Sequence, residues 1–169
     1  MAISTIDTRE MVTYPGAVLQ VKQSILTSTF SLSSTTWTDI TNLSVAITPT
    51  SATSKIYVTY DTGLSMNAGA YAAGVRLARD ASPIYIGDAS GNRVRASSWT
   101  WSDYYAYSIY AATGAYLDSP ATSSEVTYSL QLASGYSGQT VYVNRAYGDS
   151  DLFQYGRGVS QITVMEISE

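Results

Sequence analysis

The residues of this sequence that could bind a ligand are mostly aromatic. The segment SWTWSDYYAYSIYAATGAY, residues 98–116, is dense in Trp and Tyr and also holds Asp and Ser. Aromatic rings stack on the apolar faces of sugars while polar neighbours bind hydroxyls, so this segment could recognise glycans. The alternation of its rings favours a second reading, packing against a paired strand or a neighbouring subunit. The candidate contact residues are Trp99, Trp101, Tyr104, Tyr105 and Tyr107.

Arginines gather in two short stretches, GVRLARD at 74–80 and GNRVRASS at 91–98. Alternate residues of a strand share a face, so we expect Arg93 and Arg95 to point the same way. Two guanidinium groups side by side could hold acidic groups of a partner. The alternative is that they keep the surface soluble.

Acidic residues give little sign of a metal or catalytic site. Asp149 and Asp151 lie two apart in the sequence GDSD and could join a carbonyl oxygen on calcium, but a solvated turn explains them as well. The remaining Asp residues are scattered, without a spacing that predicts the paired carboxylates of a glycosidase. We predict no metal and no cofactor.

His and Cys are both absent from the chain. This excludes an imidazole base, a cysteine nucleophile, a Ser-His-Asp triad and a zinc site of Cys and His ligands. We therefore expect a protein that is not an enzyme.

The surface is expected to be poor in charge. Charged residues make up 13% of the 169 residues, against about 25% in an ordinary soluble domain. The net charge of −4 and the lack of a basic stripe argue against nucleic acid as a partner. No apolar run reaches the ~20 residues that span a bilayer, and the N-terminus has no signal-peptide pattern. A surface with few Lys and Glu loses little side-chain entropy when a neighbour covers it, as in a subunit of an assembly.

Apolar residues alternate with polar ones along most of the chain, which predicts antiparallel strands. In KIYVTYD, residues 55–61, Ile56, Val58 and Tyr60 share one face. SQITVMEIS, residues 160–168, is apolar on both faces, so it should lie inside a sandwich or at a subunit contact. No segment has the 3.6-residue period of a helix. Strands are predicted at 16–26, 30–40, 43–49, 54–61, 73–80, 82–88, 105–111, 125–134, 139–147 and 159–168.

These strands predict an all-β fold, an antiparallel jelly-roll-like β-sandwich with little helix, over residues 15–169. The connector TPTSATSK, residues 48–55, should be a corner in which Pro49 ends one strand and Lys55 begins the next. Residues 1–14 lack this pattern and form a predicted N-terminal arm, or a frayed terminus. The arm's candidate contacts to a capsid are Ile3, Ile6, Arg9, Met11 and Tyr14.

Several segments carry a resemblance to a known group of proteins. They are the strand pair around TPTSATSK, the turn YLDSP at 116–120, and the last strand ITVMEI at 162–167. From Pro15 onward the chain resembles small β-sandwich structural proteins of tailed bacteriophages, of the kind common in phages of cyanobacteria and marine bacteria. The group contains head decoration proteins and tail-fibre-like modules.

The resemblance implies a non-enzymatic virion protein with a jelly-roll-like fold, commonly trimeric. A short arm before a compact domain favours a trimeric head decoration or cement protein that binds the major capsid protein. The alternative is a tail-fibre or other receptor-binding module that recognises glycans on the host surface.

Overall fold

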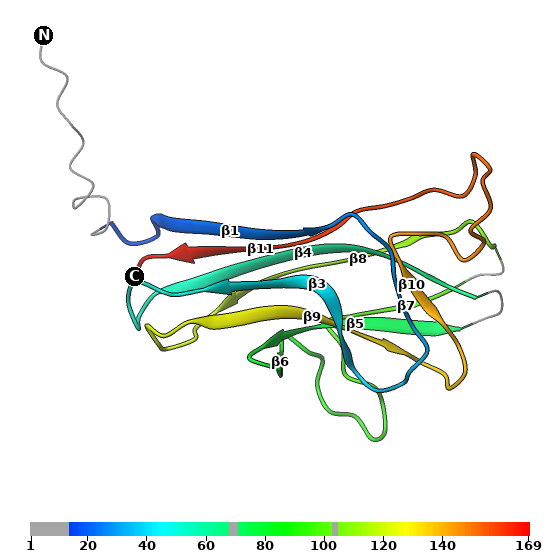
Figure 1. Cartoon of the computed structure of the whole chain (residues 1–169). Helices are drawn as coiled ribbons and strands as arrows, with labels where there is room; N and C mark the ends of the chain where they lie inside the picture. Colours follow the sequence, from blue (N-terminus) through cyan, green and yellow to red (C-terminus); the bar gives the residue numbers. More distant parts are fainter. Residues whose placement is uncertain (1–13, 68–70, 103–104) are drawn as a thin grey trace, which may run out of the picture.

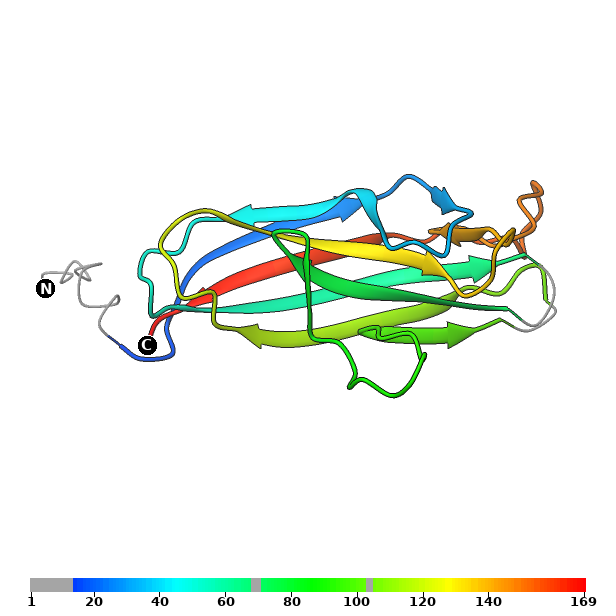
Figure 2. The ribbon, with the colours of Figure 1, turned by 90° about the horizontal axis from the view of Figure 1, so that it is seen from below.

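The chain folds into two antiparallel β-sheets packed face to face, as the computed structural model shows for residues 14–67, 71–102 and 105–169. Figure 1 shows the two layers, and Figure 2 shows that most strands run along the long axis of the domain. The described residues contain no helix, and so none long and apolar enough to cross a membrane. The predicted antiparallel β-sandwich is therefore confirmed.

The first sheet, sheet A, has four long strands and two short ones. Short β10 pairs with one end of β4, and short β2 pairs with β10. β1 and β8 are its edge strands, β11 and β4 lie between them, and all neighbours run antiparallel. In chain order its strands are β1 (Val18–Leu26), β2 (Phe30–Leu32), β4 (Lys55–Met66), β8 (Tyr110–Asp118), β10 (Val141–Val143) and β11 (Ser160–Ile167).

The second sheet, sheet B, has β9 at its centre, between β3 and β5. β5 then pairs with two short strands at different points along its length. Its strands are β3 (Thr38–Ile47), β5 (Ala72–Arg79), β6 (Ser82–Ile84), β7 (Ser98–Trp101) and β9 (Val126–Ser134).

The core lies between the sheets and is built from the residues whose alternation was visible in the sequence. Ile56 and Val58 of β4 are fully buried, as are Leu130 and Leu132 of β9. Intervening residues of β4, such as Tyr57, point out to solvent. Burial of these apolar side chains is the main force that holds the two sheets together.

The corner TPTSATSK lies where it was predicted, between the end of β3 at Ile47 and the start of β4 at Lys55. It carries the chain from sheet B to sheet A. The corner is fixed by Glu166 of β11, a carboxylate with no exposed surface. Thr50 donates its backbone N–H and its hydroxyl to Oε1 of Glu166 at 2.7 and 2.6 Å, and Gln20 donates to Oε2 at 2.6 Å.

A second buried carboxylate fixes the return from sheet A to sheet B. Asp118 ends β8, where the resemblance had singled out the YLDSP turn, and its Oδ2 accepts hydrogen bonds from Arg79 (2.7 Å) and Tyr128 (2.6 Å). Burial raises the pKa of Tyr128, and its bond to the Asp118 carboxylate raises it further. Burial alone would lower the pKa of Arg79, but the ion pair with Asp118 outweighs it and raises the pKa.

Several strand predictions are wrong. The predicted strand at 30–40 is divided between β2 and β3, and the one at 139–147 shortens to β10. The strand at 105–111 and the extended structure expected at Arg93 and Arg95 differ more. Residues 105–111 begin with a turn, and only Tyr110 and Ala111 belong to β8. Residues 93–95 lie in the loop between β6 and β7 rather than in a strand. Residues 105–111 alternate Tyr and Ile with Ala and Ser, and 93–95 place Val between two Arg, so local propensity resembled that of a strand. A strand also needs a free edge to pair with, and an extension of β7 back to 93–95 would meet the part of β5 that already pairs with β6.

Candidate functional site

The outer face of sheet A carries a row of apolar side chains that crosses four strands. Cross-strand pairs join Val21 to Met165, Met165 to Tyr57, and Tyr57 to Leu117. Val21, Tyr57 and Leu117 keep 55%, 37% and 52% of their surface exposed. We call these four residues the apolar row. A continuous apolar surface on a sheet is typical of a protein–protein contact, because single exposed apolar residues are common but rows are not.

The surroundings of the apolar row are also weakly polar. At the β1 edge, Val18 and Ile25 are more than half exposed, and Val18 pairs with Ile167. The next row, Gln23, Thr163, Thr59 and Ala115, holds no charge. The middle of this face thus holds apolar, Thr, Gln and Ala side chains, with Lys55 and Asp61 of β4 on either side, and the uncharged middle can be covered with little desolvation cost.

The outer face of sheet B differs. There Asp39 pairs with Gln131, which pairs with Arg76, and Arg76 donates to Gln131 Oε1 at 2.6 Å. Arg76 also lies over the ring of Trp37, 4.7 Å from its centroid. Ser129 donates to Asp39 at 3.1 Å. The polar groups on sheet B already form hydrogen bonds with one another within one chain. The outer face of sheet A, rather than that of sheet B, therefore exposes apolar side chains that a partner could bury.

A second group of exposed side chains lies at the loop end of the sandwich. Figure 1 places the C-terminus and the start of β1 at one end, and the end of β4 and the loops that follow β9 and β10 at the other. Tyr136 meets Tyr71 and Trp101 edge to face there, with ring centroids 5.6 and 6.3 Å apart. Phe153, in the loop after β10, is fully exposed.

The predicted aromatic contacts fall into two sets. Trp99 and Trp101 are both exposed on one face of β7, as their alternation predicted. Trp99 covers Gly74 of β5 so closely that a Cβ at that glycine would lie 2.4 Å from the ring, so it packs within its own sheet. Tyr105 and Tyr107 contact each other in a turn, 5.4 Å between centroids. Tyr104 lies outside the described residues.

Arg93 and Arg95 do not form the predicted pair, because the loop gives them separate partners. Arg93 donates to Ser90 Oγ at 2.5 Å, and Arg95 donates through Nε to the Gly87 carbonyl at 2.6 Å. Arg93 instead shares a shallow hollow of about 270 Å³ with Val94 and Trp99. A paired clamp on an acidic partner is therefore not built here.

Of the residues proposed for the arm, Ile3, Ile6, Arg9 and Met11 lie outside the described residues. Tyr14 is exposed, and its carbonyl accepts a hydrogen bond from Ser168 at 2.5 Å. Gly16 donates to the Ser168 carbonyl at 2.9 Å, so the start of the domain is tied to its last strand.

Asp149 is engaged by two arginines. Its Oδ2 lies 3.0 Å from Arg145 and its Oδ1 2.6 Å from Arg157. Both carboxylate oxygens are thus paired with guanidinium groups, which leaves them poorly placed to bind calcium. Within the described residues, no three His, Cys, Asp or Glu side chains lie close enough to hold a metal ion.

Sequence reasoning missed one feature. A groove of about 860 Å³ lies beside β8, lined by residues of the loop that follows β6 and by Tyr116. The segment SPIYIGD was predicted as a strand, but only Ser82–Ile84 forms one. Its following residues turn away, and no pattern in the sequence pairs that loop with Tyr116.

No protein-family model matches the chain, and no curated protein matches it. Fold and surface together define an antiparallel β-sandwich with one apolar outer sheet face and an aromatic loop end.

Proposed function

We propose that this protein is a non-enzymatic structural subunit of a bacteriophage virion, a homotrimer that decorates the head and stabilises the capsid. The observation that carries the proposal is the apolar row of Val21, Met165, Tyr57 and Leu117 on an uncovered sheet face. The resemblance of the sequence to phage β-sandwich proteins supplies the virion and the trimer. The row supplies a surface through which copies of the chain would meet.

The low content of charged residues supports the same proposal. With 13% charged residues, the domain has few long ionic side chains to immobilise or desolvate in a contact. The most buried ionic groups, Glu166 and Asp118, are bonded at the corners between the sheets. They make the sandwich rigid, and a rigid subunit binds a partner without further ordering.

Contact with the major capsid protein is part of the proposal and depends on the predicted arm, residues 1–14. Many copies, each burying a modest apolar area, would together oppose expansion of the head. The test is to add purified protein to emptied heads that lack it. We expect saturable binding and a higher rupture temperature. A variant without residues 1–13 should form the same oligomer but fail to bind.

A second candidate function is a tail module that binds host glycans. It is favoured by the aromatic side chains at the loop end, remote from the start and end of the domain. Antibody labelling of intact virions separates the candidates. Label over the head supports decoration, and label confined to the tail supports host binding.

A further inference from the structure

We propose that the groove beside β8 binds an acidic sugar unit, a pyranose ring that carries a carboxylate. The groove lies where the open side of the sandwich leaves the edge of β8 facing the loop after β6. This inference does not depend on the proposed virion function, because it uses none of the residues of the apolar row.

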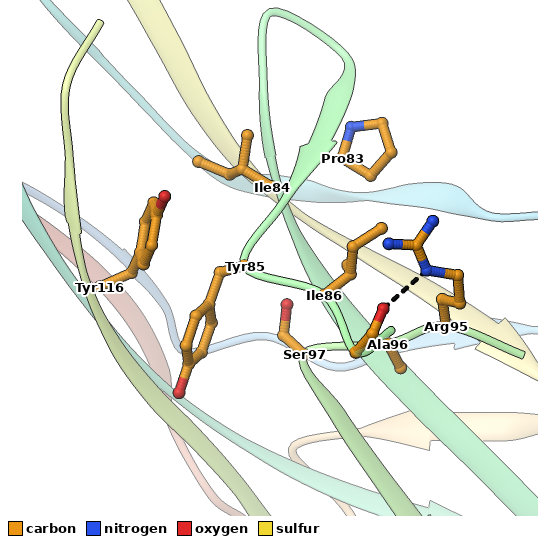
Figure 3. Close-up of a pocket in the computed structure, with 9 residues that line it drawn as sticks. Pro83, Ile84, Tyr85, Ile86, Arg95, Ala96, Ser97 and Tyr116 are labelled. Atoms are coloured by element: carbon orange, nitrogen blue, oxygen red, sulfur yellow. Dashed lines mark hydrogen bonds between the residues drawn. The ribbon is translucent and has the colours of Figure 1, made fainter. Parts of the chain in front are cut away.

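A pair of tyrosines forms one wall of the groove. Tyr85 and Tyr116 stack with 5.2 Å between ring centroids and 29° between planes. Figure 3 shows Tyr85 between Tyr116 on one side and Ser97 and Ile86 on the other. Tyr116 is partly buried against the core, whereas Tyr85 is 41% exposed. Tyr85 is therefore supported by Tyr116 and still keeps exposed ring surface, which suits contact with a sugar ring.

The backbone holds Tyr85 in place at a conformational cost. Its φ of 51° lies in the left-handed region, which residues with bulky side chains seldom adopt. The loop is tied down on both sides, since Gly87 donates to the Ala96 carbonyl at 3.2 Å and Ser97 donates to Val75 at 3.0 Å. Ser97 Oγ in turn accepts from the Leu77 N–H at 2.9 Å. A residue with a strained backbone, held in a loop that hydrogen bonds fix on both sides, is a feature of preformed binding sites.

The polar groups of the groove favour an anion. Among the described residues that line the groove, Arg95 alone is charged. Its Nε donates to the Gly87 carbonyl at 2.6 Å, which leaves the outer nitrogens of the guanidinium for a ligand. The Ser97 and Tyr85 side chains add hydroxyls. Aromatic rings, one guanidinium and several hydroxyls line the same groove, with Ile86 between Tyr85 and Arg95 (Figure 3), and this set of groups matches a ring with an apolar face, hydroxyls and one carboxylate. One Arg in a chain of net charge −4 is too little for nucleic acid.

A buried hydroxyl, that of Tyr60, lies next to Ser97 of the groove but is not part of the groove lining. Tyr60 is 4% exposed, and among the described residues no hydrogen bond of ordinary geometry reaches its oxygen. Burial raises the pKa of Tyr60 to about 12, while the Ser97 hydroxyl nearby acts in the opposite direction. Ser97 thus lies between this hydroxyl and the open groove.

The test is calorimetric titration of the full chain with a hexasaccharide of alternating glucuronate and N-acetylglucosamine, and with the neutral hexamer of N-acetylglucosamine. We expect the acidic oligosaccharide to bind in the range of about 0.1–1 mM, at least tenfold more tightly than the neutral one. Arg95→Gln should remove that tenfold difference. Tyr85→Ala should reduce affinity for both by about tenfold or more, and Tyr107→Ala, at the loop end, serves as the matched control.

Three results would overturn the inference. The first is no saturable binding of the acidic oligosaccharide at 10 mM or below. The second is equal affinity for the neutral and acidic ligands. The third is binding that Tyr107→Ala abolishes and Tyr85→Ala leaves unchanged, which would place the glycan at the loop end instead. Circular dichroism and urea unfolding of each variant show whether a loss of binding reflects a loss of fold.

Discussion

Thr50 gives both of its donors to one oxygen of Glu166, 2.7 Å from its N–H and 2.6 Å from its hydroxyl, across 116 residues of sequence. The corner between the two sheets is thereby fastened to the last strand. Glu166 faces inward between Gln20 on one neighbouring strand and Ile56 on the other. A buried charge is tolerated here because hydrogen bonds surround it.

Glu166→Gln should lower the free energy of unfolding by about 1–3 kcal/mol, because a neutral amide accepts weaker hydrogen bonds and brings an N–H₂ group toward that of Gln20. Urea unfolding followed by fluorescence measures the change. Glu125→Gln, in the exposed loop before β9, is the control and should change stability by less than about 0.5 kcal/mol. Equal stability of the two variants would contradict the role given to Glu166.

The same carboxylate should make the fold sensitive to acid. Burial alone would raise the pKa of Glu166, but hydrogen bonds from Thr50, Gln20 and Ser54 outweigh burial and lower the pKa below its ordinary 4.5. The unfolded chain therefore binds the proton more readily, and stability rises with pH in this range. The contribution of Glu166 is present above about pH 4.5 and is lost as pH falls through its lower pKa in the folded state.

Urea midpoints of the wild type and Glu166→Gln between pH 6 and 3 measure this dependence. The two midpoints should differ most near pH 6 and converge toward pH 3. Parallel curves over the whole range would show that Glu166 does not have a lowered pKa in the folded state.

Ala81→Gly should stabilise the protein by about 0.5–1 kcal/mol. Asp80 and Ala81 connect β5 to β6 and have φ values of 48° and 64°, the pattern of a two-residue type I′ turn. Such turns favour glycine at the second position, because a side chain there is strained. Ala89→Gly, in the loop after β6, is the control, and its expected effect is neutral or destabilising. A loss of stability in Ala81→Gly would contradict the strained turn.

Asn144→Ala should destabilise the protein by about 3 kcal/mol. The Asn144 side chain is fully buried, donates to the carbonyls of Leu26 and Ser28 at 2.7 and 3.0 Å, and accepts from Ser160 at 2.6 Å. Its φ of 62° adds strain for Ala. Thermal unfolding measures the loss, with exposed Asn92→Ala as control. A decrease in melting temperature no larger than that of the control would show that the hydrogen bonds of Asn144 to Leu26, Ser28 and Ser160 do not stabilise the fold.

Much of the fold could be predicted from the sequence, because a strand with one buried face has apolar residues at every second position. Ile56 and Val58 in β4, like Leu130 and Leu132 in β9, face the core as the pattern indicated. The ends of the corner at Pro49 and Lys55 were also visible, since proline cannot donate to a ladder. The order of the strands in a sheet could not be predicted in this way, because strands far apart in the sequence pair with each other. For example, β4 pairs with β11, more than 90 residues further along the chain.

The sites were less predictable. The double-sided apolar pattern of β11 indicated a subunit contact or a central strand, and Met165 does lie on the open face of sheet A. Val21 and Leu117 of the same row come from strands far away in the sequence, so only the strand register brings them into one row with Met165. Arg95 was predicted to pair with Arg93, yet the loop turns it toward Gly87 instead. Loops after β6 and β7 depend on tertiary contacts that alternation does not encode.

Sedimentation of Leu117→Asp beside the wild type tests most directly whether the outer face of sheet A joins subunits. Leu117 is exposed in the single chain, so a charge there should leave the fold intact but place an unpaired carboxylate in the contact. The control is Ser44→Asp on the outer face of sheet B, which is also exposed. We predict a trimer for the wild type and the control at micromolar concentration, and a folded monomer for Leu117→Asp. A wild-type monomer, or a Leu117→Asp trimer of unchanged stability, would contradict the account.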